Sequence, residues 1–209
     1  MNSYATIIFG GTFDPVHVGH LGIAREIAQK LSVPRVLLLP TAGNPLKHQA
    51  HASAGQRLEM LTLATAGDEL FEICDYELFQ APPTYTIETM ERLAAAGRLD
   101  GGAGFVIGAD SLKELHRWRR ADELLAMVDL IVAARPPEDF SAVLQKINEL
   151  EDRFGLDMVT KIKRNTVKTQ LYDVSSTEIR NLAAAGKPLG GLVVPAVEEF
   201  IVKNRIYSR

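Results

Sequence analysis

Two histidines three positions apart, His17 and His20, follow the glycine pair Gly10 and Gly11 in the stretch FGGTFDPVHVGH. Glycines let backbone N–H groups approach a ligand closely. Residues three apart are neighbours on a helix, so both imidazoles are expected on the first turn of a helix that starts near His17. The start of a helix attracts anions, because its free N–H groups and its dipole are positive there. The pattern predicts a phosphate site, with one capping and one core histidine as the alternative.

A zinc site is the other chemistry that a histidine pair suggests. The zinc-protease pattern spaces its histidines four apart with a glutamate between them, and the sequence shows no further set of Cys and His ligands for this pair. We therefore expect no metal bound by protein ligands alone.

The segment DVSSTEIRNLAAAG predicts a second helix start. Ser175 and Glu178 have the spacing of a capping box, which by itself would be unremarkable. Ser176 and Thr177 add hydroxyl and N–H groups, and Arg180 lies about one turn further, within reach of an anion at the same terminus. Two such helix starts in one parallel sheet predict a polyphosphate lying between them.

Further candidate ligand groups follow the apolar run in GFVIGADSLKELHRW. We expect a strand to end at Gly108 and a helix to begin at Asp110. The Asp110 carboxylate could accept hydrogen bonds from a ribose or could only cap the helix. Trp118 is the only tryptophan, and its ring could stack on a planar heterocycle or pack in the core.

Two more segments carry candidate binding residues. In PPTYTIETM, the residues Thr84, Tyr85 and Thr86 open a predicted helix, and free N–H groups at Thr86 could bind a small carboxylate. In the loop after RVLLLP, Lys47 could fold over phosphates, with His48 beside it. For both segments, helix capping or a solvated surface is the alternative.

The secondary structure must position these groups, and the sequence indicates it by short apolar runs that alternate with segments of helical periodicity. The runs are TIIF, RVLLLP, LFEICDYEL, GFVIG, DLIVAARP and, less clearly, QLYDV. Segments such as GHLGIAREIAQKL, TIETMERLAAAG and DFSAVLQKINELEDRFG lie between them. This alternation predicts an α/β fold with a doubly wound, mostly parallel sheet, whose ligand lies beyond the carboxyl ends of the strands.

The composition bounds the function classes. A chain of 209 residues with 46% hydrophobic and 23% charged residues fits one globular domain over 1–209, with a small helical portion at about 175–209. A net charge of −3 gives no general attraction to nucleic acid, and the basic residues 161–168 are expected to form a solvated strand or loop. With one cysteine, no basic leader and no membrane-length apolar run, the expected location is the cytoplasm.

Taken in order, these motifs resemble the bacterial nicotinate-nucleotide adenylyltransferases, in the nucleotidyltransferase superfamily marked by [HT]-x-G-H. The matching pieces are GGTFDPVHVGH, RLEML, PTYTIETM, FVIGADSL with the tryptophan, ARP, VSSTEIR and VPAVEEFIVKNRIY. They span nearly the whole chain. The resemblance implies a Rossmann-like fold and a reaction in NAD biosynthesis, in which nicotinate mononucleotide and ATP give nicotinate adenine dinucleotide and pyrophosphate.

The resemblance also implies residue roles. Catalytic roles in stabilising the transition state fall to His17, His20, Lys47 and Arg180. ATP binding falls to Gly10, Gly11, Thr12, Phe13, His17, His20, Gly108, Asp110, Ser176, Thr177 and Arg180. Nicotinate mononucleotide binding falls to Thr84, Tyr85, Thr86, Trp118, Asp110 and Lys47. Mg²⁺ would be carried mainly by the ATP phosphates, because the sequence shows no paired-carboxylate cage. Oligomeric state is left open, including a homo-oligomer.

One loop departs from the family pattern. The family has Pro-Pro-His-Lys where this chain reads Asn44-Pro45-Leu46-Lys47, so Lys47 aligns, Leu46 replaces the histidine, and a substitute role for His48 is open. The alternatives are another His-x-Gly-His adenylyl- or cytidylyltransferase, such as a phosphopantetheine adenylyltransferase or an enzyme preferring nicotinamide mononucleotide, and a nucleotide-binding regulator without turnover.

Overall fold

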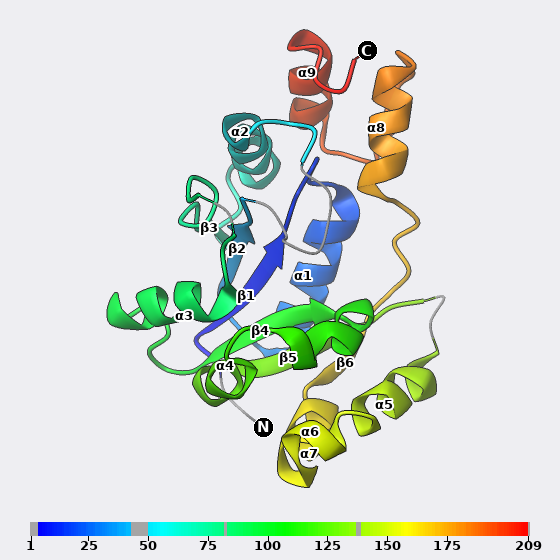
Figure 1. The fold of residues 1–209 in the computed structure, drawn as a ribbon. Coiled ribbons are helices and arrows are strands. Elements are labelled where there is room, and N and C mark those ends of the chain that lie inside the picture. Colours follow the sequence, from blue (N-terminus) through cyan, green and yellow to red (C-terminus); the bar gives the residue numbers. More distant parts are fainter. Residues whose placement is uncertain (1–3, 43–49, 82, 137–138, 209) are drawn as a thin grey trace.

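A computed structural model describes residues 4–42, 50–81, 83–136 and 139–208. The strands form one six-stranded sheet in the order β3-β2-β1-β4-β5-β6, and all neighbours pair in parallel (Figure 1). They are β1 (Thr6–Gly11), β2 (Val36–Pro40), β3 (Phe71–Ile73), β4 (Ala103–Gly108), β5 (Asp129–Ala134) and β6 (Thr166–Lys168). The order reverses between β1 and β4, so the carboxyl ends of these strands form the switch point where open parallel sheets bind ligands.

Helices cover both faces of the sheet, and α8 and α9 stand next to each other beyond the carboxyl end of β1 (Figure 1). Helices α1, α2, α8 and α9 pack on one side, and α3, α4, α5, α7 and η1 pack on the other. The helices are α1 (Val18–Leu31), α2 (Ala54–Thr65), α3 (Thr86–Ala95), the 3₁₀ helix η1 (Ala109–Arg117), α4 (Ala121–Met127), α5 (Phe140–Asn148), α6 (Glu151–Phe154), α7 (Leu156–Arg164), α8 (Ser176–Ala184) and α9 (Pro195–Lys203). In the described part of the chain, no helix has the length and apolar character needed to cross a membrane.

Side chains of the central strands alternate between the two faces of the sheet, and both sets are apolar, which explains why helices cover both faces. Ile7 and Leu38 are fully buried against α1 and α2, whereas Ile8 and Leu37 are buried against the helices of the other face. Strands buried on both faces read as continuous apolar runs, which is the pattern seen in TIIF and VLLL. The predicted doubly wound α/β fold is confirmed.

The helical portion after residue 175 packs against the same core. Ile179 of α8 and Val197 and Ile201 of α9 are buried in the cluster that contains the β1 and β2 side chains. Pro195 occupies the first turn of α9, where its missing N–H leaves no helical hydrogen bond unmade. Helix α2 begins with a Ser53–Gln56 capping box, and both of its hydrogen bonds are present.

Three local expectations were wrong. The last strand is β6, which is three residues long. The segment QLYDV forms no strand, and the ring of its Tyr172 packs against Gly22 of α1. The basic residues 161–168 are not one exposed strand or loop, because residues 161–164 end α7 and only residues 166–168 join the sheet. The helix expected over DFSAVLQKINELEDRFG is divided into α5 and α6 and ends at Gly155, whose φ of 81° lies in the left-handed region.

Candidate functional site

The two histidines form the start of α1, as the spacing predicted. His17 is the N-cap residue, and its Nδ1 accepts a hydrogen bond of 3.3 Å from the backbone N–H of His20. In return, Nδ1 of His20 accepts a hydrogen bond of 3.3 Å from the backbone N–H of His17. The rings stack with centroids 3.6 Å apart and planes at 24°. The helix therefore begins with a capping box built from two imidazoles.

Burial keeps both imidazoles neutral at physiological pH. His17 is only 7% exposed, and its burial, with the nearby charge of Arg135, lowers its pKa to about 4. Burial also lowers the pKa of His20 well below its usual value, and His17 and Arg135 add to the shift. Because each Nδ1 accepts a backbone N–H, the remaining proton of each ring is on Nε2. Each ring therefore offers one neutral N–H donor, which suits a phosphate oxygen.

The low pKa of His17 makes the protein less stable in acid. The unfolded imidazole titrates near 6.5 and the folded one near 4, so the unfolded chain binds more protons between these values. This stability is fully present above pH 6.5 and is lost as the pH falls toward 4. We expect the His17 contribution to be about 2 kcal/mol smaller at pH 5 than at pH 7.5. Urea unfolding of the wild type and His17→Asn at both pH values measures it, since asparagine can cap the helix but does not titrate. Equal losses in the two proteins would contradict the assignment.

The second predicted helix start lies directly beside the first. Ser175 caps α8 by accepting a hydrogen bond from the backbone N–H of Glu178. Ser176 Oγ donates to the Pro15 carbonyl at 3.0 Å, and an Arg180 guanidinium nitrogen donates to the Asp14 carbonyl at 2.7 Å. The N-termini of α1 and α8 are therefore held together across more than 160 residues of sequence. A second Arg180 nitrogen donates to Thr177 Oγ1 at 3.1 Å, which orients the guanidinium.

A cavity of about 370 Å³ opens at the switch point of the sheet. It brings together eight of the residues predicted from the sequence: Gly10, Gly11, Thr12, Thr84, Tyr85, Thr86, Gly108 and Trp118. The first three lie at the carboxyl end of β1, the next three lie at or just before the start of α3, and the last two flank η1. Segments that lie far apart in sequence thus meet where the strand order reverses, and the cavity has the size of a small-ligand pocket.

The aromatic wall of this cavity is formed by Tyr85 and Trp118. Trp118 is half-buried and meets Phe105 edge-on, with centroids 6.1 Å apart. The Arg119 guanidinium lies over the Tyr85 ring at 4.6 Å. Trp118 therefore both packs on the sheet and lines the cavity. Core packing and contact with a ligand are compatible for this residue, because they involve different parts of its ring.

Two expectations at the site need correction. Asp110 does not cap a helix, because the element is a 3₁₀ helix that begins at Ala109 with Gly108 as its N-cap residue. Asp110 is exposed, and its carboxylate lies next to Gly108. Phe13 is 1% exposed and packs against Phe9 and His20, so its side chain supports the histidine and is not available to ATP. Lys47, with Asn44, Leu46 and His48, lies outside the described residues.

Arg57 holds the loop between β1 and α1, although no role was assigned to it from the sequence. It is 2% exposed, and one guanidinium nitrogen donates to the carbonyls of Thr12 and Thr41, each at 2.7 Å. These carbonyls follow the carboxyl ends of β1 and β2. The available signal was its place on the buried face of α2 with Met60 and Leu61, because an arginine is rarely buried without partners.

Asp14 is the second buried charge that was not assigned. It is 4% exposed, and its carboxylate accepts hydrogen bonds from the backbone N–H groups of His51 at 2.7 Å and Ala52 at 3.0 Å. Burial by itself would raise the pKa of this carboxyl. The hydrogen bonds and the charge of Arg180 outweigh burial and hold the pKa below its usual value.

Three further charged residues stand around the site. Arg135 directly follows β5, and its charge contributes to the low pKa of both histidines. Arg119 lines the cavity, as does Glu77, whose carboxyl accepts hydrogen bonds from Thr89 and Thr84. Burial raises the pKa of Glu77. Only Arg135 lay in a recognised motif, ARP, and the other two carried no spacing signal.

Comparisons with known proteins agree with this geometry. A cytidylyltransferase-like family model matches residues 8–182. A probable nicotinate-nucleotide adenylyltransferase of Chromobacterium violaceum is 37% identical over 206 residues, covering 96% of this chain and 97% of the relative. A protein of the same description from Caldicellulosiruptor bescii is 32% identical and covers 97% and 98% of the two chains.

A solved structure shares the fold at low sequence identity. The Plasmodium falciparum nicotinic acid mononucleotide adenylyltransferase complexed with NaAD superposes with a TM-score of 0.67 at 16% identity, covering 97% of this chain and 96% of that one. The full-length similarity to the bacterial relatives, together with the matched family model, establishes the relationship. The chain belongs to the nicotinate-nucleotide adenylyltransferase family.

Proposed function

We propose that this protein transfers the adenylyl group of ATP to nicotinate mononucleotide, giving nicotinate adenine dinucleotide and pyrophosphate. The observation that carries the proposal is the switch-point cavity, whose aromatic and threonine wall lies at the same sheet edge as the paired N-termini of α1 and α8. One part suits a pyridine ring and the other suits a polyphosphate. The relatives named above, which carry this activity in their descriptions, support the same reaction.

The proposed mechanism is an in-line attack without a general base. The second pKa of a phosphate monoester is about 6, so the attacking phosphate is already mostly a dianion at neutral pH. The protein must align two anions and stabilise the charge that develops on the leaving pyrophosphate. We assign this stabilisation to the Nε2–H groups of His17 and His20, to Arg180 and to Lys47. Neutral imidazole donors suit the task, because they lose no proton during the reaction.

The remaining roles follow from position. We assign contacts with ATP to Gly10, Gly11, Thr12, the main chain of Phe13, Gly108, Ser176 and Thr177. Asp110 would bind a ribose. Thr84, Tyr85, Thr86 and Trp118 would hold the pyridine ring and its carboxylate. Arg117 and Arg119 also line this cavity, together with Glu77, and a guanidinium group can pair with the carboxylate of nicotinate but not with the neutral amide of nicotinamide.

Mg²⁺ would enter with its nucleotide as the MgATP complex. The described ranges contain no group of three or more His, Cys, Asp or Glu residues able to hold a metal ion. The Asp14 carboxylate, which is near the histidines, already accepts three short hydrogen bonds. Mg²⁺ retains several water ligands and binds readily through substrate phosphates, so this donor set fits a metal carried by the triphosphate.

The deciding experiment measures pyrophosphate release from MgATP with each candidate acceptor. We expect kcat/KM to be highest with nicotinate mononucleotide and lower with nicotinamide mononucleotide, because only the former carries a carboxylate. Release only with phosphopantetheine would assign the chain to the rival enzyme class. ATP binding without release with any acceptor would identify a nucleotide-binding regulator.

Removing the ring of Trp118 should separate the two substrates. In Trp118→Ala, we expect KM for nicotinate mononucleotide to rise about tenfold, the scale of one aromatic stacking contact, while KM for ATP changes little. Steady-state kinetics with each substrate varied in turn measures this, and Trp118→Phe is the matched control that keeps an aromatic face. Equal losses for both substrates with a lowered melting temperature would show that the residue serves only the core.

A further inference from the structure

The loop between β1 and α1 is kept in a strained conformation by contacts from distant elements. Phe13 has φ of 49°, in the left-handed region that a bulky residue rarely adopts. Such a conformation persists only where the surroundings hold it. Arg57 binds the Thr12 carbonyl on one side of Phe13, and Ser176 binds the Pro15 carbonyl on the other.

Asp14 lies in this loop, and its carboxylate anchors the loop by accepting hydrogen bonds from other parts of the chain. Its Oδ2 accepts from the backbone N–H of His51, while Oδ1 accepts from the backbone N–H of Ala52 and from the Tyr207 hydroxyl, the last at 2.8 Å. Hydrogen bonds to a buried charged group are stronger than those between neutral groups. Asp14 is three residues before the N-cap His17, so the hydrogen bonds that hold its carboxylate also restrain the backbone that leads into α1.

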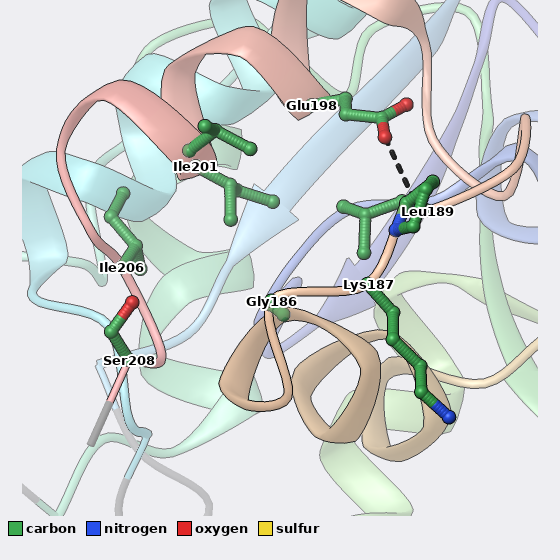
Figure 2. Close-up of a pocket in the computed structure, with 10 residues that line it drawn as sticks. Gly186, Lys187, Leu189, Glu198, Ile201, Ile206 and Ser208 are labelled. Atoms are coloured by element: carbon green, nitrogen blue, oxygen red, sulfur yellow. Dashed lines mark hydrogen bonds between the residues drawn. The ribbon is translucent and has the colours of Figure 1, made fainter.

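Tyr207 is the only one of these donors that comes from the far end of the chain, 193 positions after Asp14. Its own φ is 67°, so a second aromatic residue is held in the left-handed region. Its neighbours anchor it, since Ile206 is 5% exposed and its N–H donates to the Ile201 carbonyl at 3.0 Å. Figure 2 shows Ile206 and Ser208, on either side of Tyr207, lining a pocket of about 360 Å³ next to α9. Burial and the Asp14 charge raise the pKa of the phenol, which keeps it a donor.

We propose that Tyr207 is a positioning residue for adenylyl transfer, which acts by holding the Asp14 carboxylate and thereby fixing the two imidazoles at the start of α1. The inference rests on the proposed function for its kinetic consequence. Its structural consequence, an ordered first turn of α1, does not depend on any substrate.

The kinetic test is Tyr207→Phe, which removes only the hydroxyl. We expect kcat to fall about tenfold, the scale of one hydrogen bond to a charged group, with less than about a twofold change in KM for nicotinate mononucleotide. Tyr4→Phe is the matched control. Tyr4 precedes β1, and its hydroxyl donates to Asp129, the first residue of β5, at 2.9 Å. This hydrogen bond lies at the amino ends of the strands, away from the site. A similar loss of melting temperature in both variants, with kcat lowered only in Tyr207→Phe, is the expected result.

Two further measurements keep the proposal falsifiable. In a double-mutant cycle, Asp14→Ala with Tyr207→Phe should cost no more activity than Asp14→Ala alone, because alanine has no acceptor for the Tyr207 hydroxyl and each change breaks the same link. Hydrogen exchange of the amides of His17 and His20 should be faster in Tyr207→Phe than in Tyr4→Phe, measured without substrate. Unchanged kcat, additive losses, or equal exchange in the two tyrosine variants would overturn the proposal. If the wild type releases no pyrophosphate with nicotinate mononucleotide, the proposed function fails, and exchange alone decides the positioning role.

Discussion

Replacing His17 with alanine is expected to lower kcat about 10²- to 10³-fold with a smaller change in KM for ATP. This is the scale for removing one donor that acts in the transition state. The donor is the Nε2–H of a neutral ring, because Nδ1 is engaged with the His20 N–H and the pKa of the ring is about 4. Steady-state kinetics with ATP varied at saturating acceptor measures the effect.

The variant His17→Asn distinguishes a loss of helix capping from a loss of transition-state stabilisation. Asparagine caps helices well, so we expect this variant to keep the stability that His17→Ala loses, about 1 kcal/mol. Its kcat should remain low, because its amide is shorter than an imidazole and cannot place a donor where Nε2 lies. If His17→Ala raises KM and leaves kcat intact, His17 binds the ground state and our assignment is wrong.

Arg57→Met should be the most destabilising of the substitutions discussed, with a loss of about 3 kcal/mol in the free energy of unfolding. The methionine fills most of the volume but leaves the Thr12 and Thr41 carbonyls without their shared donor. Relief of the buried charge, whose pKa burial lowers, offsets only part of this cost. For a chain of this length, the melting temperature should fall by about 6–12 °C.

Arg153→Met is the control for Arg57. Arg153 forms an exposed ion pair with Asp122 at 2.6 Å, and such pairs contribute about 1 kcal/mol or less. Thermal unfolding of the two variants should therefore differ clearly. A small loss in Arg57→Met would mean that water or a relaxed loop replaces the guanidinium.

The fold was largely predictable because its signals are local. Apolar runs such as TIIF and VLLL separate amphipathic helices, and that alternation determines a parallel sheet covered on both faces. The sixth strand was not predictable, because β6 is three residues long and the neighbouring QLYDV has an equally apolar pattern. Only pairing with β5, which is a long-range contact, distinguishes the two.

The candidate site was predictable where residues follow a strand or start a helix, as His17, Thr86 and Ser175 do. It was not predictable where a side chain acts through a distant partner. Arg57 and Tyr207 bind groups 45 and 193 positions away, and no spacing rule connects such positions. An arginine on an apolar helix face was a usable signal for the first, whereas Tyr207 was marked only by its place at the end of the family-like tail VPAVEEFIVKNRIY, which does not identify its partner.

The contacts that join α8 and the α9 tail to the β1–α1 loop have a consequence during synthesis. The loop leaves the ribosome early, but its partners Ser176, Arg180 and Tyr207 follow 161, 166 and 193 positions later. At translation rates of about 5–20 residues per second, this delay is on the order of 10–30 s. The nascent chain can complete much of its sheet in that time, yet its two helix termini are not joined. We therefore expect the first turn of α1 to become fully ordered only after Tyr207 has left the ribosome.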